Sequence, residues 1–286
     1  MALDTKQTQK PVRKLRKVLK DALREPTPVQ VHDLRTNIRR LEAMMSALAL
    51  DSEKTGQRLL KQLTRIRKRS GKVRDMDVLT TDATRLNKDA DEGCRVQLIE
   101  HLGAERRSKA KKLHSAIANL RPKVRKNLKR LGRRLDKMVP DTRTDASEAT
   151  AKATAAALEL QTELNAPSRF TRQNIHPYRL KVKELRNVLR LAQNSKDEDF
   201  IAALGEVKDA IGDWHDWEEL RAIADEVVDH SSGCQLKGEL KRICDGKYSS
   251  AVQRAEDMRK KYLQTNGKGR KEPTKAAVVT MKTIAA

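Results

Sequence analysis

The chain has 286 residues, 37% of them hydrophobic, with twelve glycines and eight prolines, so it is long and apolar enough to bury a core. This composition excludes a wholly disordered chain, and its wealth of good helix formers argues against a strand-rich fold. The net charge of +23 is uneven: residues 1–140 hold 37 lysines and arginines against 16 acidic residues, whereas residues 141–286 hold 25 against 23. We therefore expect a polyanionic partner, with a merely well-solvated basic surface as the alternative.

Apolar residues recur at helical spacing through most of the chain, and prolines mark where helices begin or end. Pro26 and Pro28 end the first predicted helix, and Pro122 opens the sixth. The pattern predicts an all-α fold with helices over about 11–25, 29–50, 54–70, 73–90, 95–120, 122–138, 147–164, 172–194, 197–212, 214–230 and 236–264. One core-facing stripe is formed by Leu113, Ile117, Leu120, Val124, Leu128, Leu131, Leu135 and Met138.

A polar segment at residues 139–150 falls where the charge balance changes, so we place the boundary between two halves there. The predicted division is a strongly basic helical bundle at 1–140, a second helical bundle at 141–264 and a mobile basic tail at 265–286. No apolar run approaches the length that spans a bilayer, so the sequence predicts a cytoplasmic protein without a membrane partner.

Two sequence blocks occur once in each half, in the same order. Residues 175–192 align without gaps on residues 31–48, matching His176 to His32, Arg179 to Arg35, Lys183 to Arg39 and Leu185 to Leu41. Residues 204–220 align on residues 63–79, matching Gly212 to Gly71, Asp216 to Asp75, Glu218 to Asp77 and Leu220 to Leu79. This internal repeat predicts two pseudo-symmetric helical bundles.

The first block places cations and apolar residues on different faces of a helix. At 100° per residue, one stripe about 80° wide holds His176, Arg179, Lys183, Arg186 and Arg190, and the matching stripe holds His32, Arg35 and Arg39, with Arg40 beside it. Apolar residues lie roughly 130° away and are expected to pack in the core. A row of arginines and lysines on a rigid helix suits a linear phosphate chain, because guanidinium groups fork onto phosphate oxygens and ammonium groups add compact charge.

Two further groups of cations are candidates for the same surface. One group comprises Arg65, Lys68, Arg69 and Lys72. The other lies opposite the apolar stripe of its helix and comprises Lys123, Lys126, Arg130, Arg133 and Lys137. For both groups, a solvated face of an amphipathic helix is the alternative to a binding role.

Each repeated histidine lies near a predicted helix start, where its imidazole would either cap the helix or donate a hydrogen bond to phosphate. Asp75 and Asp77 are too few ligands for a metal ion, and we interpret Asp75 and Asp216 as residues that start a helix or pair with cations. The sequence contains no HExxH, Walker A or GxSxG motif. We therefore predict no catalysis, no metal and no cofactor.

The two histidine blocks and the segment GKVRDMDVL resemble the CHAD family, the conserved-histidine α-helical domain, from roughly residue 10 to residue 264. In that family a histidine is followed at i+3 and i+7 by basic residues, in two copies. The resemblance implies two helical bundles with pseudo-twofold symmetry, no catalysis, and binding of inorganic polyphosphate along a basic surface between them. Together with the cationic faces described above, the resemblance gives these polyphosphate-binding candidates: His32, Arg35, Arg39, Arg40, His176, Arg179, Lys183, Arg186, Arg190, Arg65, Lys68, Arg69, Lys72, Lys126, Arg130, Arg133 and Lys137.

Three functions are compatible with these features. The first is non-catalytic binding of inorganic polyphosphate, with polyphosphate granules as the expected cellular location. The second is a nucleic-acid-binding protein that contacts phosphates without base specificity, although seven aromatic residues provide few platforms for stacking bases. The third is an enzyme acting on polyphosphate or nucleotides, for which the sequence lacks the acidic ExExK strand of triphosphate-tunnel enzymes.

Overall fold

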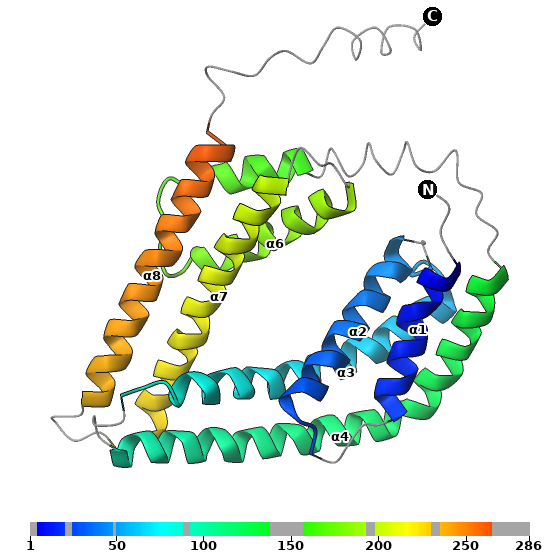
Figure 1. The fold of residues 1–286 in the computed structure, drawn as a ribbon, viewed down its shortest axis with the longest axis horizontal. Coiled ribbons are helices and arrows are strands. Elements are labelled where there is room, and N and C mark those ends of the chain that lie inside the picture. The colour runs from blue at the N-terminus through cyan, green and yellow to red at the C-terminus, as the bar shows by residue number, and fades with distance from the viewer. Residues whose placement is uncertain are drawn as a thin grey trace, which may run out of the picture. The chain divides into compact units, whose positions relative to one another are not determined.

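The computed structural model describes residues 5–20, 25–47, 50–87, 92–137, 157–192, 198–229 and 235–264. Helices account for nearly all of these residues and no strand occurs among them, which confirms the all-α fold (Figure 1). The predicted boundary at 139–150 and the predicted tail at 265–286 lie outside the described residues. The chain divides into two compact units: unit 1 comprises Met1–Asp145 and Asp216–Arg242, and unit 2 comprises Ala146–His215 and Ile243–Ala286.

Four helices form the bundle of unit 1, namely α1 (Thr5–Lys20), α2 (Pro28–Ala47), α3 (Lys54–Ala83) and α4 (Glu92–Lys137). Helix α1 packs on α2 and α4, and α3 packs on the same two helices, so the four close a ring (Figure 1). Because every helix has two neighbours, each can bury a broad apolar face and leave the opposite face to charged residues.

The core of this bundle is aliphatic and dominated by leucine. The predicted stripe on α4 faces it: Leu113, Ile117, Val124, Leu128, Leu131 and Leu135 are buried and Leu120 is partly buried, whereas Met138 lies outside the described residues. Full burial of one such side chain contributes about 1.5–3 kcal/mol to folding. The core therefore supplies the rigid frame on which the exposed cations of unit 1 are held.

Three predicted breaks are wrong, because helices run through them. Helix α3 joins the predicted helices 54–70 and 73–90 through Gly71, α4 joins 95–120 and 122–138 through Pro122, and α7 (Glu198–Val227) joins 197–212 and 214–230 through Gly212. Pro122 removes one backbone N–H from the helical ladder. Apolar residues on both sides of it are buried against the same core, and that burial outweighs the lost hydrogen bond.

Unit 2 contains helical residues 157–165, helix α6 (Ile175–Ala192), the first part of α7 and the later part of α8 (Gln235–Tyr262). Its core mixes aliphatic side chains with aromatic rings. Phe170 meets Tyr178 edge to face, with ring centroids 4.8 Å apart, and Trp214 packs beside Tyr248 at 5.5 Å. All seven aromatic residues of the chain follow residue 145, so the four-helix bundle of α1 to α4 is built without them.

The division into units differs in one respect from the single boundary expected near residue 140. Residues 216–242 group with the N-terminal helices, so α7 and α8 each belong partly to both units. Among the helices that the structure describes, none is long and apolar enough to span a membrane.

Candidate functional site

The helices that carry the repeated histidines begin with the same capping arrangement. At the start of α2, Thr27 Oγ1 accepts a hydrogen bond from the Gln30 backbone N–H at 3.3 Å, and Gln30 Oε1 accepts one from the Thr27 backbone N–H at 2.9 Å. Before α6, Thr171 and Asn174 exchange the equivalent bonds at 3.2 and 2.8 Å. Such a reciprocal capping box satisfies two backbone donors that a helix start leaves without partners.

Because threonines supply the caps, the imidazoles of His32 and His176 are left to other contacts. The His32 side chain is exposed, and its Nε2 lies 3.4 Å from Thr36 Oγ1. The His176 ring lies against that of His215, with centroids 4.5 Å apart. Its buried Nδ1 has no hydrogen-bond partner, and burial, followed by His215 and Arg179, lowers the pKa of His176.

An arginine one turn after the histidine packs on a glycine of the next helix. In unit 1, Arg35 of α2 donates from Nη1 to the backbone oxygen of Arg67 in α3 at 3.5 Å. A Cβ atom on Gly71 would lie 2.6 Å from the same nitrogen. Glycine therefore makes room for the guanidinium, while burial and then nearby Arg39 lower the pKa of Arg35.

The same contact occurs at the corresponding positions of unit 2. Arg179 of α6 donates from Nε to the backbone oxygen of Lys208 in α7 at 3.0 Å, and a Cβ on Gly212 would lie 2.8 Å from its Nη2. The two accepting carbonyls match each other in the alignment of the second sequence blocks, as do the two glycines. Each arginine is thereby held by the helix pair and retains further N–H donors.

Unit 2 has an additional arginine of this kind. Arg186 donates from Nε to the backbone oxygen of Ile201 at 3.2 Å and lies over Gly205, and burial, then Arg190, lowers its pKa. Lys183 is half-buried on the same helix, and Arg190 is exposed in its last turn. Some of the cations in the α6 stripe are therefore already hydrogen-bonded to the backbone of their own unit.

In unit 1 the position that matches Arg186 is an acid. Glu42 accepts a hydrogen bond from Arg67 Nε at 3.0 Å and one from Thr64 Oγ1 at 3.3 Å. Arg39 and Arg40 remain exposed on α2. On α3, Arg65, Lys68 and Lys72 are exposed and Arg69 is half-buried.

The α7 residues that match the exposed α3 cations are acidic. Arg65, Lys68 and Lys72 correspond to Glu206, Asp209 and Asp213, respectively. These carboxylates pair with cations of their own unit: Glu206 with Arg254 at 3.0 Å, Asp209 with Lys208 at 2.5 Å and Asp213 with Lys247 at 2.6 Å. The two units therefore share the histidine and arginine contacts but differ in the charge around them.

The predicted cationic face of α4 is confirmed as an exposed face. Lys126, Arg130 and Arg133 are exposed opposite the buried stripe. Lys137 ends the helix, and its side chain lies outside the described part of the structure.

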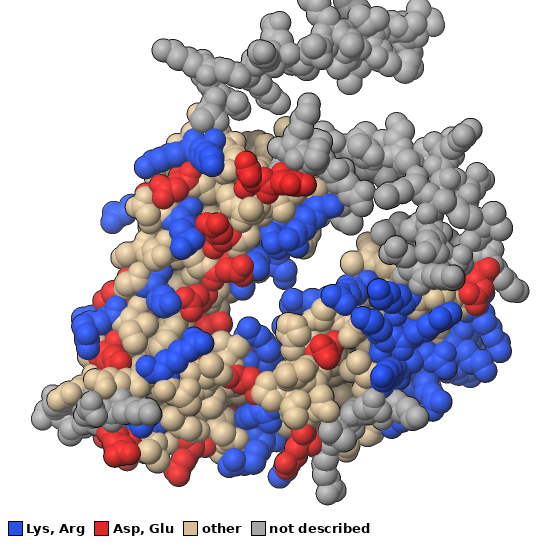
Figure 2. All heavy atoms as spheres, viewed as in Figure 1, with Lys and Arg blue, Asp and Glu red and all other residues tan. Residues whose placement is uncertain are grey.

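A cationic groove that the sequence reasoning missed lies between α1 and α4. It has a volume of about 330 Å³ and is lined by two leucines and five cations, namely Arg13, Arg16, Lys17, Arg121 and Arg125. In Figure 2 lysine and arginine side chains gather over the part of unit 1 that contains α1 and the later turns of α4. The dense basic run VRKLRKVLK in α1 is the signal that could have indicated one wall of this groove, but its pairing with a helix more than 100 residues later cannot be seen in a local pattern.

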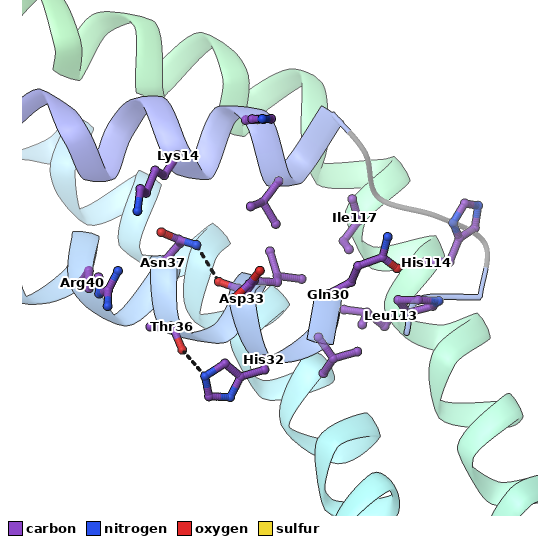
Figure 3. Close-up of a pocket in the computed structure, with 15 residues that line it drawn as sticks. Lys14, Gln30, His32, Asp33, Thr36, Asn37, Arg40, Leu113, His114 and Ile117 are labelled. Carbon is purple, nitrogen blue, oxygen red and sulfur yellow. Dashed lines mark hydrogen bonds between the residues drawn. The ribbon is translucent and has the colours of Figure 1, made fainter. Parts of the chain in front are cut away.

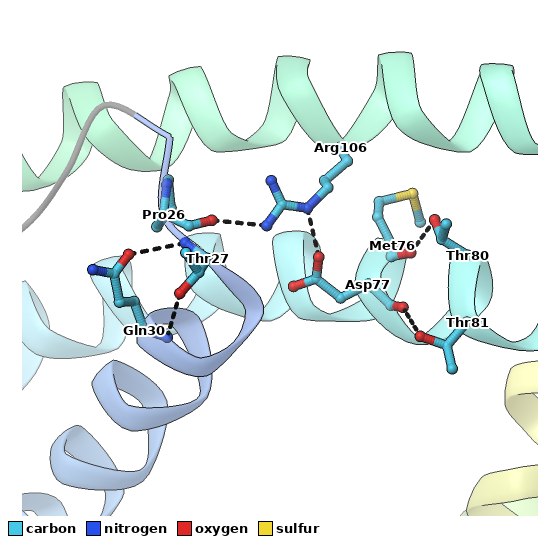
Figure 4. A network of polar contacts seen from close by, with 8 residues as sticks. All are labelled: Pro26, Thr27, Gln30, Met76, Asp77, Thr80, Thr81 and Arg106. Atoms are coloured by element: carbon cyan, nitrogen blue, oxygen red, sulfur yellow. Dashed lines mark hydrogen bonds and ion pairs between the residues drawn. The ribbon is translucent and has the colours of Figure 1, made fainter.

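The acidic residues of the second repeated block, at 63–79 and 204–220, form contacts within the fold. Asp77 accepts from Arg106 Nε at 2.5 Å, and Arg106 Nη2 donates to the backbone oxygen of Pro26 at 2.7 Å, so one arginine connects α4, α3 and the start of α2 (Figure 4). Asp75 and Asp216 lie inside long helices, so they do not start helices, and of the two roles expected for them the pairing with cations is left. Asp75 interacts electrostatically with Arg35. Across the described residues, no cluster of three or more His, Cys, Asp or Glu is placed to hold a metal ion.

Comparisons with known proteins agree with this architecture. The family model of the CHAD domain matches residues 6–225. A crystal structure of the CHAD domain from the plant Ricinus communis is 15% identical and superposes with a TM-score of 0.60, covering 91% of this chain and 93% of that chain. No curated protein matches the sequence. The family match extends over most of the chain, and on this ground the chain belongs to the CHAD domain family.

Proposed function

We propose that this protein binds inorganic polyphosphate without chemical turnover and that unit 1 provides most of the binding energy. The observation that carries this proposal is the concentration of exposed cations on unit 1, including the α1–α4 groove with its five cations. Unit 1 contains 42 lysines and arginines against 25 acidic residues, a net +17, whereas unit 2 contains 20 against 14, a net +6. A polyanion with one charge per phosphate is attracted most strongly to the first of these surfaces.

The geometry of the arginines supports binding of a phosphate chain. Arg35 and Arg179 are each held by a backbone oxygen of the neighbouring helix, so part of the entropy cost of fixing a long side chain is met before the ligand arrives. Their remaining N–H groups can donate to phosphate oxygens in charge-assisted hydrogen bonds. Exposed neighbours such as Arg39 and Lys72 would extend the contact to further phosphates.

Nucleic acid is the competing ligand, and the aromatic residues weigh against its single-stranded forms. Of the seven rings, five are buried and those of Tyr248 and Tyr262 are half-buried, so they offer little surface on which unpaired bases could stack. A competition titration of long polyphosphate against duplex DNA and RNA, at matched phosphate concentration and fixed salt, tests the proposal. Polyphosphate should win, and preferential binding of duplex DNA would replace the proposal with a nucleic-acid role.

Absence of turnover is a separate part of the proposal. Incubation of the purified protein with polyphosphate and Mg²⁺ or Mn²⁺ should release no phosphate and leave the chain length unchanged. Hydrolysis or elongation that copurifies with the protein and disappears in a binding-deficient variant would contradict it.

A polyphosphate-binding protein of this kind should collect on polyphosphate granules in cells that form them. Fluorescent tagging of the full chain, with granules stained independently, tests this part. A diffuse signal in granule-containing cells would confine the proposal to binding in solution.

A further inference from the structure

Unit 1 contains a second, chemically different cavity. It has a volume of about 480 Å³ and lies among α1, α2 and the middle of α4 (Figure 3). Its apolar lining includes Val18, Leu34, Leu113 and Ile117. Ligand pockets for small molecules have volumes of about 300–1,000 Å³ and combine an apolar wall with a few polar groups.

Asn37, one of the residues that line this cavity, has an unused hydrogen-bond acceptor. The residue is 7% exposed, and its Nδ2 donates to the backbone oxygen of Asp33 at 2.8 Å. Because a carbonyl only accepts, this bond fixes the orientation of the amide and identifies Oδ1 as the other atom. Oδ1 is buried and has no hydrogen-bond partner. A buried acceptor of this kind is satisfied by a ligand that donates an N–H or O–H group.

Cations line the same cavity. Lys14 and Lys17 of α1 and Arg40 of α2 contribute three positive charges, against the single carboxylate of Asp33. In Figure 3 Lys14 extends from α1 toward the side of α2 that carries Asn37 and Arg40. An anionic group would therefore be held next to the unused amide oxygen.

A phosphate chain does not match this combination. Ionised polyphosphate has acceptor oxygens and no N–H donor, so it would leave Asn37 Oδ1 unsatisfied and would gain nothing from the apolar wall. A molecule with a phosphate at one end and an apolar, hydrogen-bond-donating body at the other matches all three features.

We propose that the cavity between α1, α2 and α4 binds a small phosphorylated molecule of the nucleoside monophosphate type. The phosphate lies between Lys14, Lys17 and Arg40, a base N–H donates to Asn37 Oδ1, and the face of the base packs on the aliphatic wall formed by Leu34 and Ile117. This inference goes beyond polyphosphate binding and does not depend on it.

The test is isothermal titration calorimetry of the full chain with three probes. AMP carries both parts of the ligand, adenosine lacks the phosphate, and ribose 5-phosphate lacks the base. We expect AMP to bind at least about tenfold more tightly than either fragment, since each contributes an interaction that the other cannot. Ribose 5-phosphate binding as tightly as AMP would overturn the proposal, because it would show phosphate attraction alone. Failure of AMP to bind would overturn it as well.

Two variants and a matched control locate the site. Lys14→Gln removes an exposed cation from the cavity and should weaken AMP at least about fivefold, whereas Lys10→Gln, an equal change on an exposed position of the same helix outside the lining, should change it less than about twofold. Asn37→Leu should also weaken AMP while leaving polyphosphate binding unchanged. Equal effects of the two lysine changes would overturn the assignment. If the wild-type chain bound AMP but did not bind polyphosphate, the result would contradict the proposed function and leave this inference standing.

Discussion

The helix pairs α2–α3 and α6–α7 have the same internal contacts and opposite outer charge. Both begin with a threonine capping box and both hold an arginine on a glycine of the second helix. Around these contacts, Arg65, Lys68 and Lys72 of α3 face solvent where α7 has Glu206, Asp209 and Asp213. The comparison shows that the arginine–glycine contact belongs to the packing of a helix pair, whereas the charges around it can change sign without altering that packing. If the protein binds polyphosphate as proposed, we expect these outer charges to set the strength of binding.

The largest expected effect follows from reversing the outer charge of α3. The double variant Lys68→Glu and Lys72→Glu should weaken polyphosphate binding about a hundredfold or more, because each charge-assisted contact is worth roughly 1.5–3 kcal/mol. The measurement is a polyphosphate titration at fixed salt, in variants that circular dichroism shows to be folded.

The control for this reversal is Lys241→Glu with Lys260→Glu, two exposed positions of α8 with an equal change in net charge. It should cost less than about threefold, since it acts only through long-range attraction that salt screens. Equal losses in the two double variants would show that binding is diffuse and that α3 has no special part.

The next effect concerns the glycines under the two arginines. Gly71→Ala places a Cβ 2.6 Å from Arg35 Nη1, so the guanidinium must move away from the Arg67 carbonyl. We expect a loss in polyphosphate affinity of about five- to tenfold. Free energy of unfolding should change by less than about 1 kcal/mol, because alanine is the better helix former and Arg35 can swing aside.

Gly212→Ala is the matched variant in unit 2, where it displaces Arg179. If unit 1 provides most of the binding energy, the affinity for polyphosphate should fall less in Gly212→Ala than in Gly71→Ala. A larger loss from Gly212→Ala, measured in the same titration, would transfer the main site to unit 2.

Positive charge added to α7 should raise the affinity for polyphosphate, by a smaller factor than the losses described above. Asp209→Lys converts an exposed position to the sign of its α3 counterpart. It removes a surface ion pair with Lys208, which contributes little to stability, and the electrostatic attraction of Asp209 for Arg186. We expect the Asp209→Lys variant to bind polyphosphate about threefold more tightly than the Glu226→Lys variant does. Glu226→Lys makes the same change in net charge at an exposed position of unit 1. If Glu226→Lys gained as much, position on the α7 surface would be irrelevant.

The sequence was sufficient for the helical class and for the faces of the helices. Periodicity alone predicted that Val124 and Leu128 are buried while Lys126 and Arg130 are exposed, and the structure confirms this. It was insufficient around Gly71, where two separate helices, 54–70 and 73–90, were predicted and one continuous helix is found. The reason is that the space left by a glycine side chain is filled by Arg35 from another helix, and a local pattern carries no information about such a partner.

The candidate binding surface was predictable in part, for the same reason. Candidates on one helix, such as Arg35 and Arg39, follow from spacing within a helix. The groove that joins Arg13 to Arg125 depends on which helices are neighbours, and this comes from tertiary packing. The polyphosphate roles of all these residues remain predictions until the titrations are made.

The smallest expected effect concerns the pH dependence of stability through His176. Burial, His215 and Arg179 lower the pKa of His176 in the folded protein below its ordinary value near 6.5. In the unfolded chain the imidazole takes up a proton more readily, so stability is full above the unfolded pKa and falls as the pH drops through 6.5 toward the folded pKa. His176→Gln keeps a polar side chain but removes this titration. Urea unfolding at pH 7.5 and 5.5 should therefore show a larger loss of stability for the wild-type chain than for His176→Gln, with the difference developing as the pH falls below about 6.5. Equal losses would mean that burial and the neighbouring His215 and Arg179 do not disfavour the protonated imidazole of His176.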